Sequence, residues 1–276
     1  MSSISFDPKP QSTLAANREL VVKVEGLGKR FRFDQSGPYE NMADFTKGML
    51  KSLRQPLDRL RRKQEADEKN WLWALKDINL EVRRGELLGI VGHNGAGKST
   101  FLKILSQVTT PTEGQISVWG NLACLLEVGT GFNPMLTGKE NIFLNGVILG
   151  MTHAQVIQKY DQIVEFSDVG KFIEMPVRRY SSGMRARLAF SVATHLDPDL
   201  LVADEVLAVG DARFREKCFA RMNASVAKGQ TIFFVSHSEN LIQEHCTRAV
   251  LLDHGRIIHD GAPGEVLEKY REISRN

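Results

Sequence analysis

A glycine-rich stretch with a lysine and a serine at fixed spacing is the first group of residues that could do chemistry. Residues 92–99 read GHNGAGKS, fit the pattern GxxxxGK[ST], and lie between the apolar run Leu87–Val91 and a helical pattern. This context predicts a phosphate-binding loop, whose backbone N–H groups and helix dipole favour anionic oxygens. We expect Lys98 to reach the β- and γ-phosphates and the Ser99 hydroxyl to bind Mg²⁺. The residues expected at the phosphates are Gly92, His93, Asn94, Gly95, Ala96, Gly97, Lys98, Ser99 and Thr100.

Two carboxylates and a histidine follow later apolar runs and could complete a hydrolytic site. Residues 200–205 read LLVADE, so an apolar strand is expected to end in Asp204 and Glu205. Alternation along a strand sends the two carboxylates in different directions, with Asp204 near Mg²⁺ and Glu205 placed to orient the attacking water. His237 follows the apolar run Thr231–Val235. Its imidazole could contact the γ-phosphate and hold the water in register.

Composition describes an ordinary globular protein. The 276 residues are 42% hydrophobic and 25% charged, with a formal net charge of +3, which is too small to indicate nucleic acid. The three cysteines are widely separated and suggest neither a zinc site nor a disulfide framework. There is no apolar run long enough for a transmembrane helix and no signal-peptide pattern at the start. Residues 1–18 are expected to be a flexible tail.

Short apolar strands alternate with helical patterns from residue 19 onward. The strands are expected at Leu20–Val24, Leu87–Val91, Leu200–Ala203, Thr231–Val235 and Ala249–Leu252. The helices are expected at Lys98–Leu105, Lys139–Leu149, Ala154–Phe166, Met184–His195, Ala212–Ala227 and Pro263–Arg271. This alternation predicts an α/β fold with a largely parallel, buried sheet.

Residues 34–72 interrupt that alternation. Apolar residues recur there at spacings of three and four and predict an amphipathic helix, kinked near Pro56: Met42, Phe45, Met49, Leu53, Leu57 and Leu60. Basic residues crowd its later part. Such a helix favours an anionic membrane surface or a pyrophosphate headgroup.

Taken in order along the chain, the motifs GHNGAGKST, YSSGM, LLVADE, AVGD and VSHS resemble those of the ATP-binding-cassette ATPases. The resemblance implies a P-loop NTPase fold in residues 19–276, with a RecA-like core, an antiparallel β subdomain and a helical subdomain inserted at about 128–198. It also implies ATP and Mg²⁺ as cofactors.

The same resemblance implies a head-to-tail homodimer. YSSGM stands at the family's signature position, so Ser181, Ser182 and Gly183 are expected to contact the ATP that the other copy holds on its phosphate loop. Ser182 departs from the commonest spelling, as do Tyr180 and Met184. Asp211 matches the family's D-loop position, which lies between the two copies.

Two assignments stay open. The family usually has a glutamine before the helical subdomain, and Glu127 stands nearest to that place here, with a metal-sensing and partner-coupling role implied. For the aromatic ring that stacks on adenine, Phe31 matches best by local pattern, while Phe33 and Trp73 compete because of the insertion.

The YSSGM sequence and the amphipathic insertion are similar to the corresponding features of the ATPase subunits of bacterial polysaccharide exporters. That resemblance implies two copies of a transmembrane permease subunit, a lipid-linked glycan near the basic insertion, and a peripheral position on the cytoplasmic face of the inner membrane. O-antigen is the favoured cargo, with capsule or teichoic acid as alternatives, and no C-terminal carbohydrate-binding domain is expected. The alternative hypotheses for the function are the ATPase of a small lipid or drug exporter and, less favoured, a ribosome-associated protein of the same family.

Overall fold

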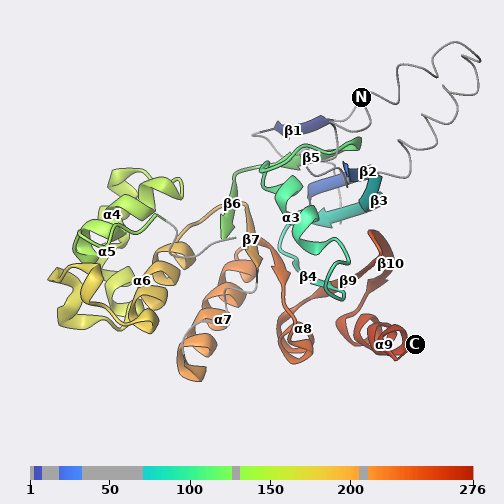
Figure 1. Ribbon diagram of the computed structural model, residues 1–276. Helices are drawn as coiled ribbons and strands as arrows, with labels where there is room; N and C mark the ends of the chain where they lie inside the picture. Colours follow the sequence, from blue (N-terminus) through green and yellow to red (C-terminus); the bar gives the residue numbers. More distant parts are fainter. Residues whose placement is uncertain (1–2, 8–18, 33–70, 126–130, 205–210, 276) are drawn as a thin grey trace, which may run out of the picture.

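The computed structural model describes residues 3–7, 19–32, 71–125, 131–204 and 211–275. Its strands form two sheets within those ranges, one of six strands in the order β10-β9-β4-β8-β7-β6 and one of four in the order β1-β5-β2-β3. Helices α4, α5 and α6 form a lobe set apart from the phosphate-loop helix α3 (Figure 1). The expected P-loop fold is therefore present, with a parallel core, a β subdomain and a helical subdomain.

The six-stranded sheet is the core that carries the site. Its strands are β4 (Leu87–Val91), β6 (Leu122–Leu125), β7 (Leu200–Asp204), β8 (Thr231–Val235), β9 (Arg248–Asp253) and β10 (Arg256–Gly261). All pairs are parallel except β9 with β10. Every residue of β4 and β8 is buried, as expected for strands covered on both faces.

The smaller sheet is mostly antiparallel and packs over helix α3. Its strands are β1 (Ser3–Asp7), β2 (Leu20–Arg32), β3 (Trp71–Arg83) and β5 (Glu113–Trp119), and α3 covers Lys98–Leu105. Strand β2 pairs antiparallel with both β3 and β5. Val22, Leu80 and Ile116 from this sheet share one hydrophobic cluster with Phe101 and Leu105 of α3. The phosphate-loop helix is thus clamped between the two sheets.

Two boundaries differ from the sequence-based expectation. Ser3–Asp7, expected within a flexible tail, forms β1 and pairs in parallel with β5. Trp71 and Leu72, expected in the insertion, belong to β3 and pair with Arg32 and Phe31. Both corrections have one physical cause. The backbone N–H and C=O groups of these residues form hydrogen bonds with a strand that is distant in the sequence, and a local sequence pattern does not reveal such a partner. The rest of the expected insertion 34–72, residues 34–70 with its amphipathic helix, lies outside the described residues.

The helical lobe begins with two well-capped helices. These are α4 (Gly138–Ile148) and α5 (His153–Ser167), and each has a complete capping box in which a threonine bonds an N3 backbone N–H. After the short 3-10 turns Gly170–Glu174 and Val177–Arg179, α6 runs over Ser182–Thr194. The lobe therefore ends by presenting the N-terminus of α6.

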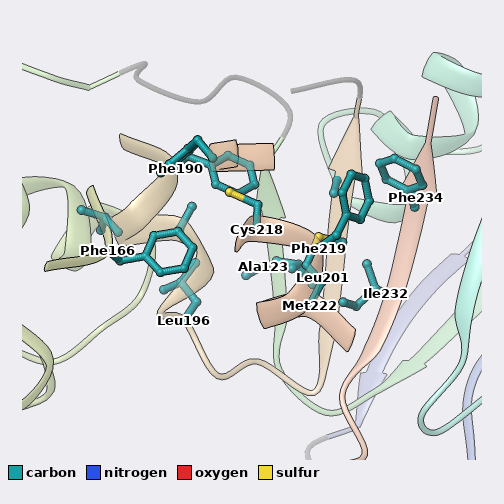
Figure 2. Packing of buried hydrophobic residues seen from close by; sticks show 14 of the residues in the cluster. Ala123, Phe166, Phe190, Leu196, Leu201, Cys218, Phe219, Met222, Ile232 and Phe234 are labelled. Carbon is teal, nitrogen blue, oxygen red and sulfur yellow. The ribbon is translucent and has the colours of Figure 1, made fainter. Parts of the chain in front are cut away.

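Aromatic packing joins the lobe to the sheet. Helix α7 (Ala212–Ala227) carries Phe214, whose ring meets Phe166 of α5 at 5.7 Å and Phe190 of α6 at 6.2 Å between centroids. On the next turns of α7, Phe219 meets Phe234 of β8 edge-to-face at 5.6 Å. Figure 2 shows Phe166, Phe190, Phe219 and Phe234 with Cys218, Met222 and Ile232, and all of them belong to one hydrophobic cluster that also includes Phe214. Helix α7 thus links the helical lobe to the sheet that carries the site.

All five expected strands and six expected helices are present, and their ends agree to within three residues except for β2, which continues eight residues beyond the expected Val24 to Arg32. Helix α8 (Glu239–His245) and helix α9 (Pro263–Ser274) close the C-terminal side. No helix within the described part of the chain is both long and apolar enough to cross a bilayer.

Candidate functional site

The phosphate loop has the backbone that its glycines predict. Gly92 has φ 153°, and a Cβ there would lie 2.2 Å from the carbonyl oxygen of Leu252 on β9. Gly97 has φ 110°, and its Cβ would lie 2.6 Å from the carbonyl oxygen of Ala74 on β3. Contacts this short exclude any side chain, so the loop approaches strands of both sheets as only glycine allows.

Lys98 is the first residue of α3 and folds back over the loop. Its Nζ donates to the carbonyl oxygen of Gly92 at 2.5 Å and to that of His93 at 3.0 Å, and the residue is buried. The ammonium group is thus already held over the loop, where a phosphate would lie. A pocket of about 210 Å³ opens here, lined by Ala74, His93, Asn94, Gly95, Gly97, Lys98, Ser99, Thr100, Val235 and His237.

At the carboxyl edge of the six-stranded sheet the structure brings together three of the expected site residues, Lys98, Ser99 and His237, in one pocket. His237 follows β8 and lines the phosphate pocket. Asp204 ends β7 and lies opposite Val235 of β8 in the register. Ligands bind at this edge in open parallel sheets. Glu205 and Glu127 lie outside the described residues, as does the side chain of Asp204.

A contact that the sequence did not predict ties the loop to β9. His93 stands at a variable position of the motif, yet its Nε2 lies 2.7 Å from Oδ1 of Asp253 and its Nδ1 lies 2.6 Å from the carbonyl oxygen of Asn94. The ring of His254 meets His93 edge-on at 5.2 Å between centroids. Only the fold reveals this group, because His93 and Asp253 are 160 residues apart in the chain.

The YSSGM turn is built as the entrance of α6. The Ser181 hydroxyl oxygen accepts from the backbone N–H of Met184 at 3.1 Å, which makes Ser181 the N-cap. Tyr180, which replaces the family's leucine, is buried and donates from its hydroxyl to the carbonyl oxygen of Phe172 at 2.6 Å. Burial raises the pKa of Tyr180 to about 12, so the hydroxyl remains a donor. Tyr180 therefore anchors the turn, while Ser181 and Ser182 stay exposed.

The turn is separate from the phosphate loop of its own chain. Among the described residues, those lining the phosphate pocket come from β3, the loop, α3 and the end of β8, and none comes from residues 181–183. Figure 1 shows α6 in the helical lobe, away from α3. Asp211, expected at a position between two copies, is exposed and caps α7 by accepting from the Phe214 N–H at 2.9 Å.

Two aromatic candidates differ in how freely their rings are presented. Phe31 is 46% exposed and lies beside Leu72, which is 60% exposed. Trp73 is half-buried under the guanidinium of Arg30, with 5.6 Å from the guanidinium carbon to a ring centroid, and a Cβ at Gly28 would lie 3.0 Å from that ring. The Phe31 ring has the Lys29 ammonium 5.2 Å from its centroid and remains the more exposed of the two. Phe33 lies outside the described residues.

The ABC transporter family model matches residues 75–208. The chain is 50% identical over 200 residues to the ABC transporter protein AbcA of Aeromonas salmonicida, covering 72% of this chain and 65% of the relative. It is 43% identical over 224 residues to the teichoic acids export ATP-binding protein TagH of Bacillus cereus, covering 80% of this chain and 40% of the relative. The chain thus spans less than two thirds of either relative.

A further relative is matched over most of its length. The O-antigen export system ATP-binding protein RfbB of Klebsiella pneumoniae is 44% identical over 199 residues, which cover 72% of this chain and 81% of the relative. A solved dimeric ATP-binding cassette in a post-hydrolysis state, bound to ADP and Pi, has the same fold, with a TM-score of 0.65 at 19% identity over 88% of this chain and 98% of that one. With its phosphate loop, its fold and these relatives, the chain belongs to the ABC transporter family.

Proposed function

We propose that the chain binds Mg²⁺-ATP on its phosphate loop and hydrolyses it. The observation that carries this proposal is the loop itself, with Lys98 held over the carbonyl oxygens of Gly92 and His93 and His237 on the same pocket. When ATP binds, the ammonium would exchange those carbonyls for phosphate oxygens, a charge-assisted and stronger contact. Ser99, exposed at the pocket, would bind Mg²⁺ through its hydroxyl.

The catalytic step requires a group that orients water. Glu205 takes this role, with Asp204 near the metal ion and His237 against the γ-phosphate. Support comes from the edge of the sheet, where β7 and β8 end side by side and deliver Asp204 and His237 from neighbouring strands. Glu127 remains the candidate for sensing the metal from the start of the helical lobe, and Phe31 for stacking on adenine.

The complete site forms between two copies of the chain. Ser181, Ser182 and Gly183 lie at the exposed N-terminus of a 13-residue helix, where backbone N–H groups and the helix dipole suit a γ-phosphate. Since this turn does not line the pocket of its own chain, it would serve the pocket of a partner copy. Asp211 would lie at the same boundary between copies. The dimeric state of the solved cassette with ADP and Pi supports this arrangement.

ATP turnover in this dimer would power export of a lipid-linked polysaccharide through two copies of a separate transmembrane permease. Support comes from the names of the relatives, which belong to O-antigen and teichoic acid export. The basic amphipathic segment within residues 34–70 suits a lipid-linked pyrophosphate at the membrane surface. The chain would then act on the cytoplasmic face of the inner membrane.

An ATPase assay of the complex with its transmembrane permease tests this proposal. Glu205→Gln should abolish turnover, while the matched control Glu268→Gln, on an exposed face of α9, should not change it. Lipid-linked O-antigen should stimulate the wild-type rate. Turnover that survives in Glu205→Gln would contradict the catalytic assignment, and stimulation by small lipids or drugs in place of the glycan would contradict the cargo.

A further inference from the structure

Three potential metal ligands meet where the phosphate loop touches the β9–β10 turn. They are His93 on the loop and Asp253 and His254 at the turn, and one ligand atom from each lies within 4.8 Å of the other two. Asp253 lies between the histidines, with its Oδ1 at 2.7 Å from Nε2 of His93 and 3.9 Å from Nε2 of His254. Neither turn residue has a role in the proposed binding and hydrolysis of ATP.

The backbone holds these residues in place before any ligand arrives. His254 and Gly255 have φ values of 43° and 75° and form the two-residue link between β9 and β10. Such primed hairpin turns favour Asn-Gly, so a histidine at the first position is unusual. The N–H of Gly255 donates to the carbonyl oxygen of Ala96 in the phosphate loop at 3.0 Å. The turn and the loop are therefore joined as one unit, which lowers the cost of organising a site there.

The hydrogen bonds of His93 indicate that two hydrogen-bond acceptors face each other at the centre of the group. A carbonyl oxygen can only accept, so the contact from Nδ1 to Asn94 requires the proton on Nδ1. In a neutral ring Nε2 is then an acceptor, and it faces Asp253 Oδ1, which is also an acceptor. Two acceptors at 2.7 Å need a positive partner, which is either a second ring proton or a cation.

We propose that these three residues form a binding site for a divalent transition metal ion of the Zn²⁺ class. Two imidazoles and one carboxylate are a ligand set typical of Zn²⁺, with a fourth position left for water. Imidazole nitrogen also selects against Mg²⁺, so the site is distinct from the nucleotide's metal at Ser99. The bound ion would pin the phosphate loop to the β9–β10 turn.

Only a small adjustment is needed to admit the ion. Tetrahedral ligands at about 2.0–2.2 Å from zinc lie roughly 3.3–3.6 Å from each other. The gap between His93 and Asp253 would therefore widen, and His254 would swing inward. Its side chain is 85% exposed and has room to do so, while that of Asp253 is 20% exposed and supplies the fixed point.

Calorimetric titration of the full chain with Zn²⁺ tests the site, using untagged protein with Mg²⁺ in excess and no nucleotide. His254→Asn is the informative variant, because asparagine retains the preference for this turn but is a poor zinc ligand. His153→Ala is the matched control, an exposed histidine at the start of α5. Co²⁺ in place of Zn²⁺ adds a spectroscopic signature, the visible absorption of a tetrahedral ion.

We expect one high-affinity ion per wild-type chain and a tetrahedral Co²⁺ spectrum. Loss of a residue that hydrogen-bonds a metal ligand typically weakens metal binding about 10- to 100-fold. Loss of a direct ligand should weaken Zn²⁺ binding by at least that much. His254→Asn should show that loss, and His153→Ala should bind as the wild type does. Equal affinity in His254→Asn, or no saturable site in the wild type, would overturn the proposal and leave His93 and Asp253 as an ion pair.

Discussion

The substitution Gly183→Asp separates the structural role of the YSSGM turn from its proposed role in catalysis. Gly183 is the second residue of α6, and a Cβ there would meet nothing closer than the Ser181 Oγ at 3.9 Å. Its φ lies outside the left-handed range, so no strain opposes a side chain. An aspartate should therefore fit the isolated chain.

The isolated chain should gain stability. Replacing glycine within a helix gains about 0.3 kcal/mol for aspartate, and an acid in the first turn gains about 0.3–1 kcal/mol from the helix dipole. The sum of about 0.6–1.3 kcal/mol corresponds to an increase in Tm of roughly 1–5 °C at this chain length. Differential scanning calorimetry of the nucleotide-free protein measures it.

ATP turnover should fall in the same variant. The new carboxylate would face the γ-phosphate held by the partner copy, and two like charges about 4 Å apart repel by roughly 4 kcal/mol at a protein surface. Even half of that energy lowers the rate about 30-fold, and all of it lowers the rate roughly a thousandfold. Steady-state kcat/KM for ATP is the assay.

Gly183→Asn is the matched control, because it has the same shape without the charge. It should retain at least about ten times more activity than Gly183→Asp, since only the aspartate carries the repulsion. Equal rates in the two variants would refute the electrostatic reasoning. A lower Tm for Gly183→Asp than for the wild type would refute the prediction that aspartate stabilises the isolated chain.

The remaining predictions concern stability. Tyr180→Phe removes the bond to the Phe172 carbonyl, which keeps its bond from another backbone N–H at 2.9 Å, so the free energy of unfolding should fall by only about 0.5–1.5 kcal/mol in urea denaturation. Asp211→Ala removes the α7 cap and should cost about 1 kcal/mol, while Asp211→Asn should restore most of it; equal losses would contradict a capping role. Burial lowers the pKa of His195 to about 4, so the unfolded chain binds a proton that the folded chain does not, and stability should fall as the pH falls from about 6.5 toward 4. His195→Gln should flatten the dependence of Tm on pH in that window; an unchanged slope would contradict this assignment.

Local signals were sufficient for the parts of the fold that depend on neighbouring residues. The phosphate loop follows from its spacing, because Gly92 and Gly97 are required by backbone approaches that no other residue tolerates. Strands β4 and β8 follow from unbroken apolar runs, because both faces of the sheet are covered. The N-terminus of α6 follows from a serine cap before a helix-forming stretch.

Elements that depend on partners distant in the sequence could not be predicted from local sequence patterns. Strand β1 is defined by pairing with β5, more than 100 residues later in the chain, and β3 extends to Trp71 because Arg32 pairs with it. The group around His93 was missed for the same reason, since Asp253 reaches it only when β9 lies beside β4. In the sequence, Tyr180 is only a departure from the residue that the family usually has at this position. Its hydrogen bond to the Phe172 carbonyl oxygen shows that it anchors the turn.

Mixing two inactive variants tests most directly whether the ATP site is shared between copies. Lys98→Ala disables the phosphate loop and Gly183→Asp disables the turn. In a head-to-tail dimer, one copy of each kind leaves one of the two sites fully intact. Because half of randomly paired dimers are mixed, an equal mixture should recover about one quarter of the wild-type ATPase rate. A mixture as inactive as its separate components would contradict the shared site.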